Sequence, residues 1–168
     1  MSKVFEKIVF IQVYSYFEKN KLLYASQYGF RSLHSTELAA LEMSDIISRK
    51  MDEGKIPLSI FLDLSKAFDT LDHTILLKKL QYYGFNGVAL SWFKNYLSDR
   101  TQFVDFDGTS SSMLNLNTGV PQGSILGPLL FMIYMNDISA ASDKFVAVLY
   151  ADDSNLVSSL CSFDLSHT

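Results

Sequence analysis

The amino-acid sequence predicts an α+β fold, with helices packed on one face of an antiparallel sheet. Stretches with apolar residues at helical three-to-four spacing are interspersed with short apolar runs bounded by Gly, Asp and Ser, which are typical of strands. A parallel sheet would need a stricter alternation of helix and strand. The chain of 168 residues is 48% hydrophobic, which is enough for one domain with a buried core and excludes a disordered chain.

Two helices are predicted at the start of the chain. The first is amphipathic, and its predicted buried face consists of Val4, Phe5, Ile8, Val9, Val13, Tyr16 and Phe17. The second is predicted over residues 36–53, where Ser35 or Thr36 can cap its start and Gly54 ends it. Its candidate core residues are Leu38, Leu41, Ile46 and Ile47.

A strand and two further helices are predicted next. Pro57 opens an apolar run at 58–64 that predicts a mostly buried strand. Asp72 is a candidate N-cap for a helix that closes near Gly84. A further helix is predicted over residues 86–97.

Two hairpins are predicted in the remainder. They pair a strand at 101–106 with one at 113–117, and a strand at 145–150 with one at 155–159. Asp107-Gly108 is a hairpin signal in the first, although its Ser-rich loop is longer than two residues. The tip of the second hairpin is predicted at Ala151–Ser154. Between the hairpins, an apolar helix is predicted to run to about Ile138, with Pro128 tolerated in its first turn.

Composition excludes several classes of protein. The chain has 14 Lys and Arg against 18 Asp and Glu, and this net charge of −4 argues against a nucleic-acid coat protein but not against a local basic surface. Its single cysteine excludes an intrachain disulfide, and its three separated histidines show no zinc-site spacing. No signal-peptide pattern is visible, and the apolar run at 128–135 is far short of the ~20 residues of a membrane helix. We therefore expect an intracellular protein of the nucleus or cytoplasm that is neither secreted nor associated with a membrane.

Three acidic residues sit at unusual places. Asp63 ends an apolar strand, while Asp152 and Asp153 lie at the tip of an apolar hairpin. Carboxylates beside buried strands lose hydration and repel one another, and a cation such as Mg²⁺ can neutralise them. Asp152 and Asp153 can equally be ordinary turn residues, whereas strand interiors disfavour Asp63. The three could build a two-metal site if their strands are neighbours.

Two further features allow more than one interpretation. Gly119, Gly123 and Gly127 precede a helix and could let backbone approach an anionic ligand, although a plain helix-entry loop is the alternative. Gln122 could add a neutral hydrogen-bonding side chain there. Phe68 follows Asp63 by five residues, and could be either a flat wall beside the metal site or a core residue.

These segments together resemble the reverse transcriptases of non-LTR (LINE-like) retrotransposons. The sequence FLDLSKAFDTLDH at 61–73 resembles motif A, GVPQGSILGPLLF at 119–131 resembles motif B, and YADD at 150–153 resembles motif C. QYGFR at 27–31 and the stretch 92–102 resemble elements before and between these motifs. The order agrees with the family, and the resemblance covers nearly the whole chain.

The resemblance implies a set of metal ligands and a cofactor. Asp63 and Asp152 would be the principal ligands of two Mg²⁺ ions, with Mn²⁺ as a possible substitute. Asp153 would complete the carboxylate cluster, and the Leu64 carbonyl would lie nearby. The reaction implied is nucleotidyl transfer, in which a primer 3′-hydroxyl attacks the α-phosphorus of a dNTP and pyrophosphate leaves.

The resemblance also implies contacts with nucleotide and nucleic acid. The nucleotide-binding residues would be Ser65, Lys66, Ala67, Phe68, Gln122 and Gly123. Phe68 would match the steric gate that excludes a 2′-hydroxyl, whereas Lys66 is also interpreted as a solvated or structural residue of its motif. Tyr150 would lie near the primer end, and Arg31 would contact template or nucleotide. The partners implied are an RNA template, a DNA primer and a dNTP.

The resemblance predicts a single, incomplete reverse transcriptase domain over 1–168. Residues 1–56 would be part of the fingers, and 57–168 a palm-like sheet with motifs A, B and C. The family's upstream Arg-Pro-Ile segment is absent, and the chain ends fifteen residues after Asp153, without a thumb. We therefore expect weak or no primer extension from this chain alone, and clear extension with flanking segments restored. The alternatives are an inactive retrotransposon-derived remnant or a nucleic-acid-binding module, while the motif B match disfavours a cyclase-like phosphotransfer enzyme.

Overall fold

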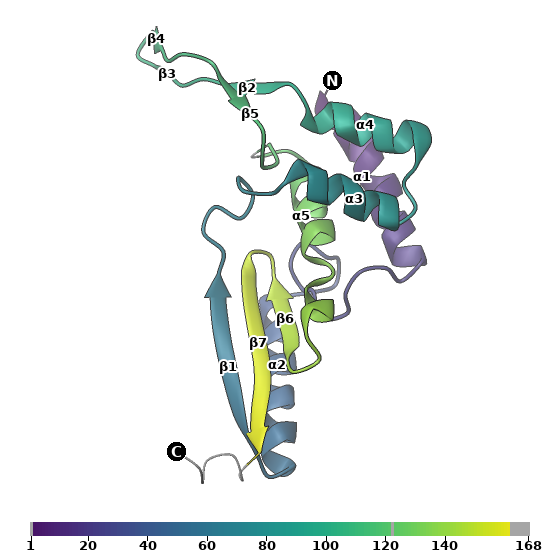
Figure 1. Cartoon of the computed structure of the whole chain (residues 1–168), viewed down its shortest axis with the longest axis vertical. Coiled ribbons are helices and arrows are strands. Elements are labelled where there is room, and N and C mark those ends of the chain that lie inside the picture. Colours follow the sequence, from purple (N-terminus) through teal and green to yellow (C-terminus); the bar gives the residue numbers. More distant parts are fainter. Residues whose placement is uncertain (1, 122, 162–168) are drawn as a thin grey trace. The chain divides into compact units, whose positions relative to one another are not determined.

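The computed structural model describes residues 2–121 and 123–161, which fold as two compact units (Figure 1). The first unit takes in the described residues up to Phe10 together with Lys66–Tyr134. The second takes in Ile11–Ser65 and the described residues from Met135 onward. Helices and antiparallel sheets make up both, as predicted.

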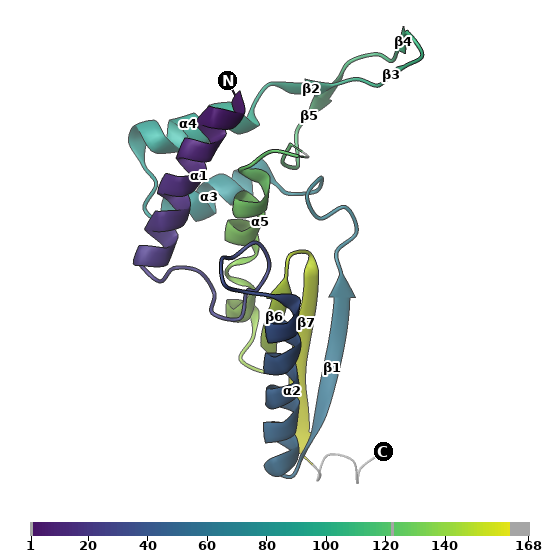
Figure 2. The ribbon, with the colours of Figure 1, turned by 180° about the vertical axis from the view of Figure 1, so that it is seen from behind.

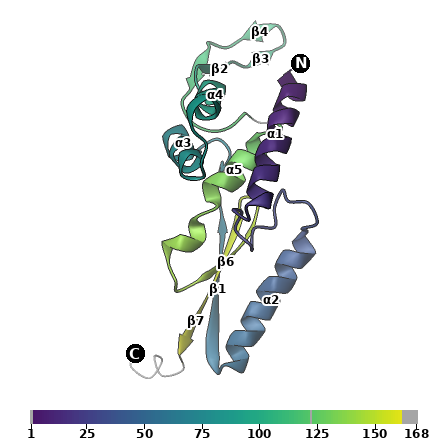
Figure 3. The ribbon, with the colours of Figure 1, turned by 90° about the vertical axis from the view of Figure 1, so that its right-hand side faces the viewer.

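The described part of the second unit contains a three-stranded antiparallel sheet of order β1-β7-β6. Its strands are β1 (Lys55–Asp63), β6 (Val146–Tyr150) and β7 (Asp153–Cys161). Helix α2 (Thr36–Asp52) lies along one face of this sheet (Figure 3). Figure 2 shows the same arrangement from behind, with α2 in front of β6 and β7. The sheet therefore brings the end of β1 beside the turn between β6 and β7.

The core of the second unit forms between α2 and the sheet. Ala39 and Ile46 of α2 are buried with Val148 and Val157 of the strands. Ser35 caps the helix by accepting a hydrogen bond from the Leu38 backbone N–H at 3.3 Å. The predicted helix and the burial of Ile46 are therefore correct. Leu38 and Leu41 are exposed, however, so their prediction as core residues is wrong.

The prediction of a mostly buried strand at 58–64 is also wrong. Strand β1 runs from Lys55 to Asp63 and is an edge strand of the sheet. Its four residues Ile56, Leu58, Ile60 and Leu62 are each at least 40% exposed. Alternate residues of a strand point to opposite faces, so these four share the face away from α2, and the apolar run does not imply burial on both faces.

The described part of the first unit contains helices as well as two short hairpin sheets. Helix α3 (His73–Tyr82) begins at Asp72, whose side chain accepts a hydrogen bond from the Ile75 N–H at 2.9 Å, as predicted. This bond to the charged form lowers the pKa of Asp72. Helix α4 (Gly87–Leu97) packs on α3, and α5 (Gly127–Met135) is almost entirely buried. Helix α5 ends before the predicted Ile138, which lies in the 3-10 helix η1 (Ile138–Ala141).

Helix α1 (Ser2–Lys19) divides its residues between the two units, and its predicted buried face is only partly correct. Val13 and Phe17 are buried, but Val4, Phe5, Ile8 and Tyr16 are exposed. Glu6 is buried instead, and its carboxylate accepts a hydrogen bond from the Ile125 N–H at 2.8 Å. Within the described ranges, no helix is long and apolar enough to span a membrane.

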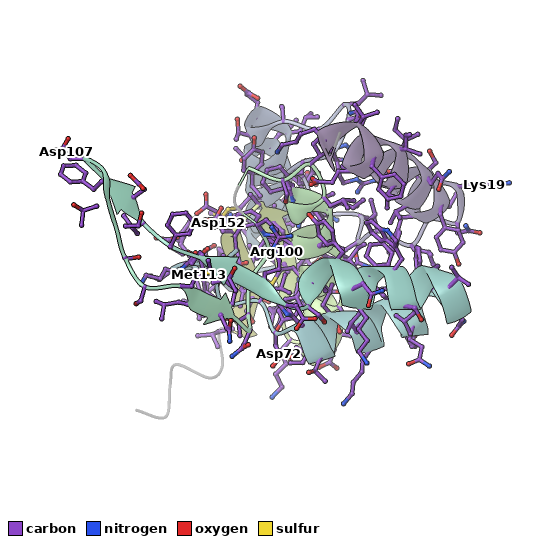
Figure 4. The ribbon with its side chains drawn as sticks, turned by 90° about the horizontal axis from the view of Figure 1, so that it is seen from above. Lys19, Asp72, Arg100, Asp107, Met113 and Asp152 are labelled. Atoms are coloured by element: carbon purple, nitrogen blue, oxygen red, sulfur yellow. The ribbon has the colours of Figure 1, made fainter. Side chains whose placement is uncertain are left out.

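The first predicted hairpin forms with a tighter tip than expected. Strand β2 (Arg100–Gln102) pairs with β5 (Leu114–Leu116), and β3 (Asp105–Phe106) pairs with β4 (Thr109–Ser110). The turn is therefore the two residues Asp107-Gly108 themselves, and Figure 4 shows Asp107 at the outer end. Both have positive φ, which suits the Asp-Gly pair.

Candidate functional site

Two of the three predicted acidic ligands lie opposite each other in the sheet. Asp63 at the end of β1 pairs in register with Asp153 at the start of β7, and Asp153 also pairs with Tyr150 of β6. Side chains opposite each other in an antiparallel pair share a face of the sheet. Asp152 lies in the turn between β6 and β7, directly before Asp153. The sheet topology thus brings together carboxylates that are far apart in the sequence.

These carboxylates keep much of their contact with water. Asp63 and Asp153 are exposed and Asp152 is half-buried, so the expectation that all three lose hydration is wrong. Like charges directly opposite on neighbouring strands destabilise a sheet, so the register pairing predicts a repulsion between Asp63 and Asp153. A bound cation would remove this repulsion.

The donor set fits a hard divalent cation. Carboxylate oxygens are the ligands that Mg²⁺ prefers, usually with several waters and substrate phosphates in the remaining positions. Among the described residues, no three His, Cys, Asp or Glu side chains converge closely enough to hold a metal on their own. Asp63, Asp152 and Asp153 supply carboxylate oxygens of the kind that Mg²⁺ accepts, but within the described ranges they do not form a cluster that could hold the ion alone.

The turn that carries Asp152 has an unusual backbone. Ala151, the first of its two residues, has φ +56°, a left-handed conformation that costs an L-residue roughly 1–2 kcal/mol. Ala151 is nevertheless buried. Non-glycine residues hold such conformations where the surroundings over-determine them, which is common at functional sites.

A groove of about 430 Å³ opens beside the paired carboxylates. Its walls come from the first half of α2 and from the ends of the three strands. It is lined by Thr36, Ala39, Ala40, Met43, Phe61, Leu62, Asp63, Tyr150, Asp153 and Asn155. Tyr150, predicted to lie near a primer end, therefore shares this groove with Asp63 and Asp153.

Arg31 makes its hydrogen bonds to the chain itself. Its guanidinium donates to the Tyr24 carbonyl at 3.1 Å and to the Gln27 carbonyl at 3.4 Å. It also forms an ion pair with Glu18 at 3.1 Å. The predicted contact of Arg31 with template or nucleotide stays a prediction, and the described bonds give this side chain a structural role within residues 18–31.

In the first unit, the second half of motif A is joined to the start of motif B. The Val120 N–H donates to the Phe68 carbonyl at 2.8 Å, and the Gly119 N–H donates to the Leu71 carbonyl at 2.7 Å. Gly119 has φ +82°, and a Cβ there would lie within 2.9 Å of three Asp69 backbone atoms. The glycine is therefore required, both by conformation and by close approach.

Sequence reasoning missed two contacts that complete this junction. His73 Nε2 lies 2.6 Å from the Gly119 carbonyl oxygen, and the Thr118 hydroxyl donates to the Asp69 carbonyl at 3.0 Å. The spacing of the glycines predicted a close approach of the backbone to an anionic ligand, whereas the structure shows Gly119 close to the Asp69 backbone. The junction fixes the loop that enters α5.

The predicted nucleotide-binding residues occupy several environments. Phe68 is half-buried, with its ring 4.7 Å from the Phe131 ring of α5, so one face packs on the core. Ala67 is buried, whereas Lys66 and Gly123 are exposed and have positive φ. Leu64 and Ser65 follow β1 in the second unit. Gln122 lies outside the described residues.

A polar pocket of about 480 Å³ lies beside the same junction. It is lined by Lys66, Asp69, His73, Arg100, Gln102, Leu116, Thr118, Gly119, Val120 and Pro121. The lining carries two cationic side chains, Lys66 and Arg100, and one acidic side chain, Asp69, so it is slightly basic within an acidic chain. Basic side chains with additional N–H and O–H donors are suited to phosphate groups.

The chain belongs to the reverse transcriptase (RNA-dependent DNA polymerase) family, whose model matches residues 1–162. It is 32% identical over 163 residues to the probable RNA-directed DNA polymerase from transposon X-element of Drosophila melanogaster. It is 28% identical over 160 residues to the RNA-directed DNA polymerase from mobile element jockey of the same species. Each match covers 91% of this chain and 17% of the relative, so the chain spans about a sixth of their length.

Solved structures of telomerase share the fold. The telomerase from Candida albicans, in complex with the TWJ fragment of telomeric RNA, matches 99% of this chain with a TM-score of 0.63 and 17% identity. This chain covers 32% of that protein. Apo telomerase from Candida tropicalis, truncated from the C-terminal domain, matches 84% of the chain with a TM-score of 0.58. The predicted family resemblance to non-LTR retrotransposon reverse transcriptases and the predicted fold class are confirmed.

Proposed function

We propose that this chain carries the catalytic carboxylates of an RNA-directed DNA polymerase. The substrates are an RNA template, a DNA primer and a dNTP. The primer 3′-oxygen forms a bond to the α-phosphorus, the bond to the β-phosphate oxygen breaks, and pyrophosphate leaves. The observation that carries the proposal is the register pairing of Asp63 with Asp153 beside Asp152, in a chain of this family.

The carboxylates would hold divalent cations, for which Mg²⁺ is the natural choice and Mn²⁺ a substitute. Two such ions, when bound, lower the pKa of the attacking hydroxyl and stabilise the leaving oxygen. The chain's own contribution is to fix Asp63 and Asp153 on neighbouring strands and Asp152 in the turn between them. The Leu64 carbonyl, directly after Asp63, is a further oxygen ligand that we propose for this site.

We propose that Phe68 sets the choice of sugar. Its ring is fixed on one side by Phe131, with a centroid distance of 4.7 Å, and the joined backbone of residues 68–71 and 119–120 limits its movement. A fixed ring can exclude a 2′-hydroxyl by steric contact. Ser65, Lys66, Ala67, Gln122 and Gly123 would complete the nucleotide site, and Tyr150 would lie near the primer end.

Primer extension on an RNA template tests the proposal. The purified chain, alone and with its flanking coding sequence restored, is incubated with a labelled primer, dNTPs and Mg²⁺. We expect Asp152→Asn to lower extension about a thousandfold or more, because it removes a carboxylate that stabilises the metal-assisted transition state by several kcal/mol.

The matched control is Asp107→Asn, which removes the same charge at the tip of the β3–β4 hairpin. This variant should extend the primer as well as the unchanged chain. Equal extension by the Asp152→Asn variant and the unchanged chain would contradict the catalytic role. Failure of every form to extend the primer, together with failure to bind Mn²⁺, would favour the inactive remnant.

A further inference from the structure

We propose that Gly29 is a positioning residue that holds the turn carrying Asp152 and Asp153. The inference rests on the proposed function of those carboxylates and assigns a role to a residue in none of the three catalytic motifs. Gly29 belongs to the segment Tyr24–Arg31, which we call the brace.

The brace is attached to the last strand residues before the turn. The Tyr28 N–H donates to the Leu149 carbonyl at 2.8 Å, and the Leu149 N–H donates to the Ser26 carbonyl at 2.9 Å. Gln27 and Leu149 thus form a parallel bridge next to the β6–β7 hairpin. The brace extends the sheet at the point where β6 enters the turn.

Gly29 lies directly against the turn backbone. A Cβ on Gly29 would lie 2.1 Å from the Ala151 nitrogen and 2.8 Å from the Ala151 Cα. Contacts this short cannot exist, and the opposing atoms are backbone, which cannot rotate away as a side chain can. The φ of Gly29 lies outside the left-handed region, so glycine is required here for space rather than for conformation.

The turn needs such external support. Ala151 has φ +56°, whereas glycine, asparagine or aspartate is the usual residue at this kind of position. Without a surface against it, the backbone of residues 151–152 could relax to a less costly conformation. Any relaxation would displace Asp153 from its position opposite Asp63. The contact with Gly29 therefore fixes the spacing of the proposed ligands.

The brace is itself held in place. The Ser26 hydroxyl donates to Glu42 of α2 at 2.8 Å, and Arg31 bonds the Tyr24 carbonyl and Glu18. Within the brace, the Gly29 N–H donates to the Gln27 side-chain oxygen at 2.9 Å, and Gln27 is only 1% exposed. These bonds make the brace a fixed surface rather than a loose loop.

The test is a Mn²⁺ titration of the full chain, followed by electron paramagnetic resonance, with thermal unfolding measured in parallel. Gly29→Ala should weaken Mn²⁺ binding by about tenfold or more, the scale of effect expected of residues that orient metal ligands. The control is Gly54→Ala, also in the second unit. Gly54 has φ +69° and open space around its Cβ position, so this change lowers stability without touching the turn.

A purely structural role for Gly29 would lower the unfolding temperature of both variants and leave their Mn²⁺ affinity unchanged. That result would overturn the inference. If Gly29→Ala does not fold, Gln27→Leu removes the hydrogen bond to the Gly29 N–H and places an apolar side chain of similar size in the buried site. It should bind Mn²⁺ more weakly than Gly54→Ala does, and equal affinity would overturn the inference. Failure of the unchanged chain to bind Mn²⁺ would instead contradict the proposed metal site.

Discussion

The two hairpin tips of this chain have the same length, two residues each, and opposite surroundings. The β3–β4 tip consists of Asp107-Gly108, both with positive φ, and a Cβ at Gly108 would meet open space. The β6–β7 tip consists of Ala151 and Asp152, and the left-handed residue is a buried alanine against Gly29. The first turn has residues that favour it, whereas the second is held by its neighbours.

This difference shows which of the two turns depends on tertiary contacts. A turn built from Asp-Gly forms through local preference and needs no tertiary contact. A turn that places an alanine at φ +56° opposes local preference, and such conflicts concentrate at functional sites. The tip with the unfavourable turn also contains Asp152 and leads directly into Asp153, the first residue of β7.

The largest expected effect on stability tests whether local residue preference or tertiary contacts stabilise each turn. Gly108→Ala introduces a Cβ at φ +74° and should lower the unfolding free energy by about 1–2 kcal/mol, or roughly 2–8 °C in unfolding temperature. Ala151→Gly removes strain but adds freedom to the unfolded chain, so the net change should be under about 1 kcal/mol. Thermal unfolding monitored by circular dichroism measures both. A larger loss from Ala151→Gly than from Gly108→Ala would reverse the comparison.

A smaller effect tests the repulsion between the paired carboxylates. Asp153→Asn removes a negative charge opposite Asp63 and should raise the unfolding temperature by about 1–3 °C at low ionic strength with EDTA present.

Asp105→Asn is the counterpart in the other hairpin. Asp105 accepts a hydrogen bond from the Ser110 hydroxyl at 2.7 Å, so its replacement should give no increase. Differential scanning calorimetry of both variants, with and without 5 mM Mg²⁺, measures the effect. A lower unfolding temperature for Asp153→Asn in EDTA would show that the two carboxylates do not repel each other.

The smallest effect concerns pH and the brace. Burial and a hydrogen bond to Glu42 raise the pKa of Tyr28 from 10.0 to about 12. Because the folded state favours the protonated phenol, this stabilisation is complete below pH 10 and is lost as the pH rises toward 12. Tyr28→Phe should therefore lose less stability than the unchanged chain between about pH 9 and 11. Urea unfolding at both pH values measures this, and an equal loss would exclude the Tyr28 contribution.

Much of the local structure could be predicted from the sequence, because it depends on neighbouring residues. Ser35 and Asp72 cap helices at the predicted positions, and Asp107-Gly108 forms the turn of a hairpin. Exposure could not be predicted in the same way. Leu58 and Leu41 have apolar patterns typical of core residues, but whether a face is covered depends on which elements lie next to it.

The candidate site also has features that local sequence indicates and features that depend on tertiary pairing. Asp63 was identifiable because strand interiors disfavour Asp, whereas Asp152 and Asp153 stood out only through the resemblance of YADD to motif C. Their closeness depends on the pairing of β1 with β7, which spacing along the chain does not encode. The contact of Gly29 with Ala151 joins segments far apart in the sequence, so no local pattern could indicate it.

The most direct test of the central claim is a calorimetric titration with Mn²⁺ of three forms of the chain. The unchanged chain and Asp107→Asn should bind Mn²⁺ with the same affinity, because the β3–β4 tip takes no part in the site. Asp153→Asn should bind at least about tenfold more weakly, because it removes one of the paired carboxylates. Equal affinity of all three forms would contradict the claim that the β6–β7 turn and the end of β1 form a divalent-cation site.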